Sequence, residues 1–408
     1  MAVISTVESS GFIPEIWLAT ALGYLRNYIT LLPSVTIDTQ LPTGDTFSVG
    51  KTLHLPKRGT LVVNQKAESG TYTVQNPQSS TVDLTLNHHP EVTIALTSEV
   101  IAFQNQPQQV GYVIDAVAKL AEDVDISLFN LWKTVPAANT ITNAGVITEA
   151  NILSARKVLR DNKVPANFPA FGVVSTAEEA AILQLPNLVR YDAMGRAGNT
   201  ARAEIGMGPT LPGSIGEAYG FSIAPTQLVP QVAGNDNTLQ TLSITGAPTG
   251  GTFIPHTGAP SVAYNATVAQ VQASLNTVFG AGNTYVAGTA GTFYTVAIMA
   301  GAVTLVPSSA FTGGTAPAIA AAQVAQTVGG KNLFYTPDAI LFASRGLPLP
   351  PPGTGALGTV MTDPVTGLTM RMVTSWNPSI GSMQITLDLL YGFAPMRPEH
   401  LVLISTSS

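Results

Sequence analysis

The sequence contains no cysteine, which excludes disulfides, thiolate metal sites and cysteine nucleophiles. Charged residues make up only 10% of the chain, against about 25% in an average soluble protein. The formal net charge is −6, so no basic excess indicates nucleic-acid binding. A chain with so few charges and no membrane span usually covers its apolar surface with other subunits. We therefore expect a protein that assembles.

Targeting and membrane-spanning segments are also missing. The first ten residues lack the basic region of a secretory signal. The most apolar window, residues 293–306, is about as long as a buried core segment and shorter than a span. We expect a soluble chain with no membrane partner.

Signatures of catalysis and of metal binding are missing as well. The histidines include no His-x-x-x-His pair, and the adjacent His88 and His89 point to opposite faces of a strand. Gly44 to Thr52 resembles a phosphate-binding loop, but its glycines are one residue too far apart and residues 53–56 continue as a strand. There is no Gly-x-Ser-x-Gly elbow. The sequence predicts no catalytic, cofactor-binding or metal-binding residue.

One long stretch lacks charge altogether. Residues 237–330 contain no Asp, Glu, Lys or Arg, so all 18 basic and 24 acidic residues lie elsewhere. The stretch is rich in Gly, Ala and Thr, and alternating Val, Tyr, Ile and Phe favour folded strands over disorder. We predict strands at 239–244, 284–288, 293–299 and 302–306, with one helix at 267–279. Residues 233–330 are therefore predicted to form an inserted β-rich domain.

The remaining sequence is built around residues 107–135, where small or apolar side chains recur at steps of three and four. Pro107 suits a first helical turn and Pro136 ends the run. The pattern predicts a helix roughly 40 Å long. Lys119, Glu122, Asp123 and Asp125 fall off the apolar stripe and are expected in water or in polar contacts. The stripe consists of Val110, Ile114, Val117, Ala121, Val124, Leu128 and Leu131.

Residues 33–98 show a different pattern, with a period of two. Strands are predicted at 46–49, 60–64, 71–75 and 81–86, with glycine-containing turns between them. Much of this region is polar on both faces, and a hairpin of that kind does not hold itself together. We expect part of 42–80 to project from the body and to become ordered on a neighbouring subunit.

Other elements follow from local signals. Helices are predicted at 14–32, 148–160 and 176–185, and a short buried strand at 170–175. Asp-Pro and Asn-Pro turns separate strands at 359–362, 368–376, 382–391 and 400–405, which are predicted to form one antiparallel meander. The overall prediction is an α+β fold.

Several motifs, taken in order, resemble those of tailed-phage major capsid proteins of the Hong Kong 97 fold. The resemblance covers residues 1–230 and 331–408. The motifs are Phe-Ile-Pro-Glu-Ile-Trp at 12–17, Gly-Asp-Thr at 44–46 followed by Leu-Pro at 55–56, residues 147–165 with Phe-Gly-Val-Val-Ser at 171–175, and Ile-Thr-Leu-Asp-Leu-Leu-Tyr-Gly at 385–392 with Arg-Pro-Glu-His at 397–400.

The resemblance implies a specific division of the chain. It comprises an N-terminal arm and helix (1–41), an extended loop (42–80), a peripheral domain with a spine helix (81–140 and 353–408), an axial domain (141–232 and 331–352) and the insertion (233–330).

The resemblance also implies a function. Subunits of this family self-assemble into hexamers and pentamers that close into an icosahedral shell around double-stranded DNA, so the chain is expected in the virion after assembly in the host cytoplasm. Implied partners are a portal, a packaging terminase and a scaffolding protein. Because the arm-like motif begins at residue 12, we expect a separate scaffold or none, and no cleaved scaffolding segment.

The extended loop carries the predicted subunit contacts. Its charged residues Lys51, Lys57, Arg58, Lys66 and Glu68 are the candidate interface residues. Cross-linking through these lysines is not predicted, although one branch of the family cross-links. Residues 262–267 with 271–275 are similar to a small β-rich domain that recurs in phage virion proteins. The insertion is therefore expected to decorate the outer surface or to cap contacts between capsomers, and decoration or cement proteins remain possible partners.

Two alternative functions remain. An encapsulin-type compartment shares this fold and houses enzymes in place of DNA, although the added domain and the phage-like opening argue against it. A nucleotide-binding enzyme would rest on Gly44 to Thr52 alone.

Overall fold

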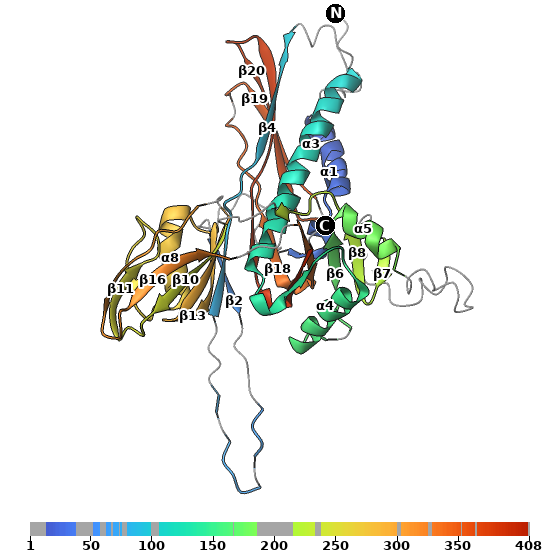
Figure 1. The fold of residues 1–408 in the computed structure, drawn as a ribbon. Coiled ribbons are helices and arrows are strands. Elements are labelled where there is room, and N and C mark those ends of the chain that lie inside the picture. Colours follow the sequence, from blue (N-terminus) through green and yellow to red (C-terminus); the bar gives the residue numbers. More distant parts are fainter. Residues whose placement is uncertain are drawn as a thin grey trace, which may run out of the picture.

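In the computed structural model, helices pack against several sheets, and a pair of strands leads into an arm that projects from the body (Figure 1). The structure describes residues 14–37, 52–57, 63–66, 68–72, 74–75, 80–98, 106–165, 167–185, 215–232, 238–299, 303–324, 329–351, 353–363 and 365–406. Within these residues the mixture of helices and strands confirms the predicted α+β class.

The long helix is present and is the centre of the largest core. Helix α3 (Gln106–Phe129) continues into a 3-10 turn, η3 (Asn130–Thr134). The stripe residues Val117, Val124 and Leu128 are fully buried. They pack with α1 (Pro14–Tyr28) and with the inner face of a four-stranded sheet in the order β19-β20-β21-β4. Its strands are β19 (Ala356–Thr362), β20 (Thr369–Asn377), β21 (Ser382–Leu389) and β4 (Glu91–Thr97).

The predicted C-terminal meander is right for three strands and wrong for the fourth. Strand β23 (Leu401–Thr406) leaves the meander, and β4 takes the place beside β21. Instead β23 pairs antiparallel with β17 (Gly329–Tyr335) and parallel with β5 (Thr140–Asn143). Every residue of β23 is buried, and a run that is apolar on both faces suits the middle of a covered sheet.

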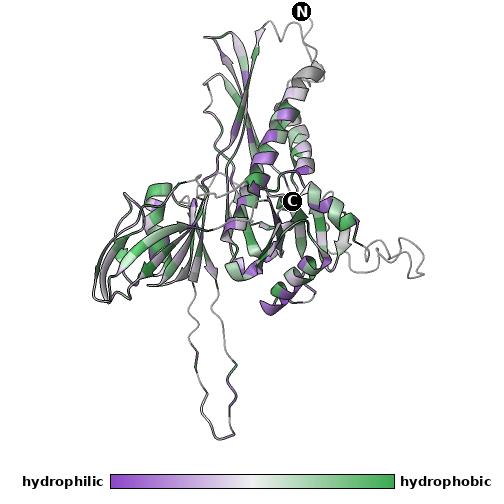
Figure 2. Cartoon of the chain, in the orientation of Figure 1, coloured by the Kyte–Doolittle hydropathy of each residue, from purple (hydrophilic) through white to green (hydrophobic). Residues whose placement is uncertain are grey.

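That second sheet has seven strands and two covering helices. Its order is β5-β23-β17-β6-β8-β7, with β9 (Gln231–Val232) paired to the start of β17. Helix α4 (Glu149–Asp161) begins with a Thr148–Asn151 capping box and packs Ile152, Ala155 and Leu159 inward. Its outer side is hydrophilic, as Figure 2 shows. The other elements are β6 (Phe171–Val174), α5 (Thr176–Leu183), β7 (Gly216–Ala218) and β8 (Phe221–Pro225).

The uncharged segment, residues 238–324, has a core of its own. Tyr294, Leu242 and Leu275 are fully buried within it. Helix α8 (Val268–Phe279) confirms the helix predicted at 267–279, and a capping box at Thr267 begins it. The segment has two sheets. The four-stranded sheet has the order β13 (Thr284–Thr289), β14 (Phe293–Ile298), β10 (Leu239–Thr245), β16 (Ala318–Gln323). The three-stranded sheet has the order β12 (Val262–Ala263), β11 (Gly250–Ile254), β15 (Ser308–Thr312).

One strand predicted in this segment is wrong. Of the strand predicted at 302–306, the described residues 303–306 form no strand, and the side chain of Gln240 bonds part of their backbone. Its Nε2 donates to the carbonyl oxygen of Val303 at 2.5 Å, and its Oε1 accepts from the amide of Leu305 at 2.9 Å. Gln240 thereby takes the place of a neighbouring strand.

A third sheet and a strand pair complete the architecture. The short strand β1 (Thr36–Ile37) pairs parallel with β18 (Ile340–Ser344), which pairs antiparallel with β22 (Tyr391–Pro395). Strands β2 (Thr52–Lys57) and β3 (Ser80–Thr85) pair over six residues each. The division into arm, extended loop, peripheral, axial and inserted domains stays a prediction.

Candidate assembly surfaces

The most exposed apolar side chains of the described chain lie on the arm beyond β2 and β3. Val63, Tyr72 and Val74 are 85%, 83% and 91% exposed. Figure 1 shows this arm projecting away from the sheets. The Nζ atom of Lys66 lies 4.4 Å from the centre of the Tyr72 ring, a cation–π contact at the surface. These three side chains have almost no cover within the described residues.

The predicted strands of the arm are only partly present. Strand β3 matches the prediction for 81–86, but the described residues of 60–64 and 71–75 belong to no strand. Their side chains are polar or exposed on both faces, so no third layer stabilises a ladder there. The strand predicted at 46–49 lies outside the described residues. Residues 52–57 form strand β2, so the phosphate-loop hypothesis lacks the helix that such a loop requires.

The five candidate interface residues fall into two groups. Lys66 and Glu68 lie on the projecting arm and are exposed. Lys51 and Arg58 lie outside the described residues. Lys57 is the last residue of β2, and the structure describes its backbone only. Their role at an interface stays a prediction.

The root of the arm is fixed closely to the body. A Cβ atom on Gly392 of β22 would lie 2.2 Å from the carbonyl oxygen of Thr85 in β3, so only glycine allows this approach. The His88 ring stacks on the rings of both Tyr391 and Phe393, at centroid distances of 5.1 and 4.9 Å. Burial lowers the pKa of His88, and the nearby Asp123 carboxylate opposes this shift in part. A neutral ring stacks in this apolar site without a buried charge.

Two acidic side chains of α3 hold neighbouring elements in place. Tyr391 donates its hydroxyl to Asp123 at 3.1 Å. Asp125 is fully buried and accepts the amides of Thr30 at 2.8 Å and Leu31 at 3.3 Å, where α1 has ended. Burial raises the pKa of Asp125 from 3.8 to about 7, although these two hydrogen bonds lower it. The sequence placed Asp125 off the stripe but did not identify its partner.

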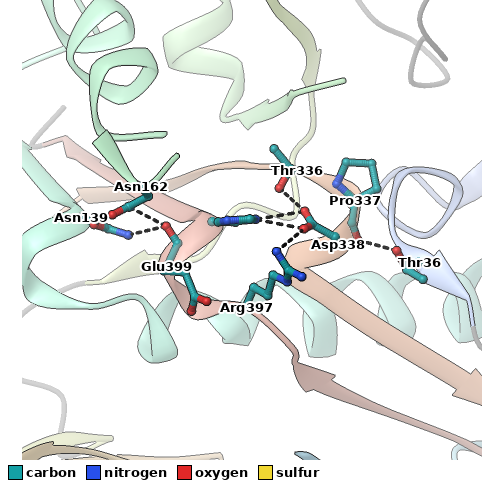
Figure 3. Close-up of polar contacts among 9 residues, drawn as sticks. Thr36, Asn139, Asn162, Thr336, Pro337, Asp338, Arg397 and Glu399 are labelled. Carbon is teal, nitrogen blue, oxygen red and sulfur yellow. Dashed lines mark hydrogen bonds and ion pairs between the residues drawn. The ribbon is translucent and has the colours of Figure 1, made fainter. Parts of the chain in front are cut away.

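A polar cluster joins the turn before β23 to the turn before β18 (Figure 3). Asp338 accepts a hydrogen bond from Thr336 Oγ1 at 2.5 Å and from His400 Nδ1 at 3.0 Å. The guanidinium of Arg397 lies 3.5 Å from the same carboxylate. Thr36 Oγ1 donates to the carbonyl oxygen of Pro337 at 2.8 Å. These contacts fix the crossing of the chain between the two sheets.

The second half of that cluster anchors helix α4. Asn162, just after α4, donates Nδ2 to the carbonyl oxygen of Glu399 at 2.7 Å, and Asn139 donates to the same oxygen at 3.0 Å (Figure 3). Asn139 also donates to the carbonyl oxygen of Leu401 at 2.9 Å. The motif at 397–400 therefore works as a structural junction.

A cleft of about 1080 Å³ separates the uncharged segment from the root of the arm. Its lining includes Asp83, Pro136, Thr241, Tyr285 and Lys331. Lys331 donates Nζ to Ser405 Oγ at 2.6 Å and lies 5.5 Å from the Trp132 ring. Burial lowers the pKa of Lys331 to about 8.

No group of three or more His, Cys, Asp or Glu side chains in the described ranges is arranged to hold a metal ion. None of the helices in those ranges combines the length and hydropathy needed to cross a membrane.

Comparison with known proteins gives matches among solved structures. No protein-family model matches the sequence, and the search of curated proteins found no match. The capsid of the cyanophage P-SCSP1u aligns at 10% identity over 93% of this chain and 88% of its own, with a TM-score of 0.49. The mature capsid of bacteriophage PhiM1 aligns at 11% identity over 92% and 86%, with a TM-score of 0.46. The capsid of a native GTA particle aligns at 10% identity over 94% and 91%, with a TM-score of 0.45. Phage capsid structures are thus among the solved structures to which this chain is similar.

Proposed function

We propose that this chain is the major capsid protein of a tailed phage. Copies would form hexamers and pentamers that close into an icosahedral shell around double-stranded DNA. The chain would act as a structural protein without catalysis, in contact with a portal and, where present, scaffolding and decoration proteins.

The projecting arm carries the proposal. Its apolar side chains Val63, Tyr72 and Val74 have almost no cover within the described chain. Burying a valine side chain completely stabilises a complex by roughly 1.5–3 kcal/mol. An arm that lies on a neighbouring subunit would gain free energy of this size for each apolar side chain that it buries. Many such contacts in a closed lattice add to a stable shell, although each one is weak.

The fixed root of the arm supports the same function. Close packing of Gly392 on Thr85 and stacking of His88 set the direction in which the arm leaves the body. A fixed direction reduces the conformational entropy lost when the arm docks. The long helix α3 and its sheet supply the rigid body from which the arm reaches.

The test is assembly of the full chain with and without the arm's apolar side chains. The wild type, expressed alone or with a candidate scaffold, should form shells or capsomers in electron microscopy and light scattering. A double variant, Tyr72→Ser with Val74→Ser, should remain unassembled while its free energy of unfolding changes little. Asn64→Ser is the matched control, since it replaces an exposed polar side chain in the same arm.

Two results would contradict the proposal. One is a wild-type chain that stays monomeric with every scaffold tried. The other is a double variant that assembles as efficiently as the wild type. Purified shells that contain protein cargo and no DNA would favour the encapsulin alternative.

A further inference from the structure

The uncharged segment has one sheet edge toward the body and one away from it. In the four-stranded sheet, β13 and β16 are the two edge strands. The β13 side contacts the body, where Tyr285 donates its hydroxyl to the carbonyl oxygen of Phe393 at 3.2 Å. Asn87 donates to Asn283 Oδ1 at 2.9 Å beside it. Strand β16 lies on the opposite side of the sheet, away from β2 (Figure 1).

The register of β16 shows which of its backbone groups point outward. Thr241 lies opposite Ala322 and Ser243 opposite Ala320. The amide of Val324 donates to the carbonyl oxygen of Leu239 at 3.1 Å, so the even-numbered residues of β16 are the ones bonded to β10. Bonded and outward-facing residues alternate in an antiparallel pair. The N–H and C=O groups of Ile319, Ala321 and Gln323 therefore point away from the sheet, and within the described ranges no strand pairs with them.

Nothing in the strand guards this edge. Natural edge strands are usually protected against pairing by lysine, by proline or by a bulge. Strand β16 reads Ala-Ile-Ala-Ala-Ala-Gln, and no charged residue occurs anywhere between 237 and 330. The exposed side chains beside the outward groups are the methyl groups of Ala318, Ala320 and Ala322, which leave room for another backbone.

We propose that β16 of one copy pairs antiparallel with β16 of a second copy across a two-fold axis. A register centred on Ala321 places Ile319 of each copy opposite Gln323 of the other. All three outward residues of each strand then pair, in about six hydrogen bonds. A homotypic contact brings identical charges together, and here there are none to repel, so the edge is self-complementary. The inference rests on the proposed function only in requiring that copies of the chain assemble.

The direct test is amide-resolved hydrogen–deuterium exchange on the full chain, in shells and in dissociated subunits. The amides of Ile319, Ala321 and Gln323 should exchange at least ~10-fold more slowly in shells, because assembly gives them acceptors. The amides of Ala320 and Ala322, already bonded to β10, should change far less.

Two variants separate the edge contact from folding. Ala321→Pro removes an outward N–H that the subunit's own sheet does not use, a place where edge strands accept proline. Ala320→Lys puts a like charge near the two-fold axis in both copies. Ala290→Lys is the matched control, since it places the same charge in an exposed turn of the same segment. Both edge variants should abolish the slowing and release subunits at lower urea, and the control should do neither.

Each other outcome is decisive. Intact shells with unprotected outward amides overturn the inference and leave the proposed function standing. If the outward amides become protected only when another virion protein is added, that protein and not a second copy of this chain pairs with β16, and the inference is wrong. Ala320→Lys shells that match the wild type in exchange and in urea resistance also overturn it. A chain that never assembles overturns the proposed function together with the inference.

Discussion

Replacing Asp125 tests whether its carboxylate holds the chain that follows α1 against α3. Asp125→Ala removes the only carboxylate that accepts the amides of Thr30 and Leu31 in the described chain. A buried amide left without an acceptor costs about 1–3 kcal/mol. Leu31 is fully buried and Thr30 is partly buried, so we expect the free energy of unfolding to fall by roughly 2–5 kcal/mol.

The same residue predicts a pH dependence. The pKa of Asp125 is about 7 in the folded chain and about 3.8 when the carboxyl is free in water. Between these values the Asp125 carboxyl binds a proton in the folded state and not in the unfolded state, so its contribution to stability is greatest below about pH 4 and falls as the pH rises toward 7. Three pKa units correspond to roughly 4 kcal/mol. Asp125→Asn has no proton to lose and should not show this fall.

Urea unfolding of unassembled subunits at pH 4.5, 6 and 8, followed by the fluorescence of the buried Trp132, measures both effects. The stability of Asp125→Asn relative to the wild type should rise with pH. A difference that is constant from pH 4.5 to 8 would refute the assignment, because the carboxyl would then titrate alike in both states.

Three further perturbations have defined outcomes. Asp388→Ala removes the carboxylate to which the partly buried guanidinium of Arg371 donates through Nε at 3.0 Å, and should cost about 1–3 kcal/mol in urea unfolding. Gly392→Ala should push the root of the arm away from Thr85, so that assembly in light scattering fails even where circular dichroism shows a folded subunit. Thr267→Ala removes the capping box of α8 and should lower stability by about 1 kcal/mol, with faster amide exchange confined to the first turn of that helix.

Elements with a strong local pattern were predictable from the sequence. The apolar stripe on α3 and the helices predicted at 148–160 and 267–279 are all present at the expected positions. In each case one stretch of chain contains the whole signal, because helix periodicity and capping depend on neighbours three or four residues apart.

Features that depend on distant partners were not predictable. The acceptor role of Asp125 depends on amides 94 and 95 residues away in sequence. The placement of β23 depends on β17 and β5, although its unbroken apolar run was a usable signal. Strand β16 has almost no β-branched or aromatic residue, so its alanines gave no indication of a strand. For the interface, the sequence indicated the projecting loop, and the structure adds the exposure of Tyr72 and Val74.

The pairing of β9 with β17 has a consequence for how this chain could be modified. Val232 lies directly opposite Gly329 in an antiparallel pair, so the chain leaves the seven-stranded sheet and returns to it at adjacent positions. To the rest of the molecule, the intervening residues therefore occupy the place of a hairpin loop. A two-residue turn, or a foreign domain whose two ends lie close together, could connect the same two positions. Other proteins could therefore be inserted here for display.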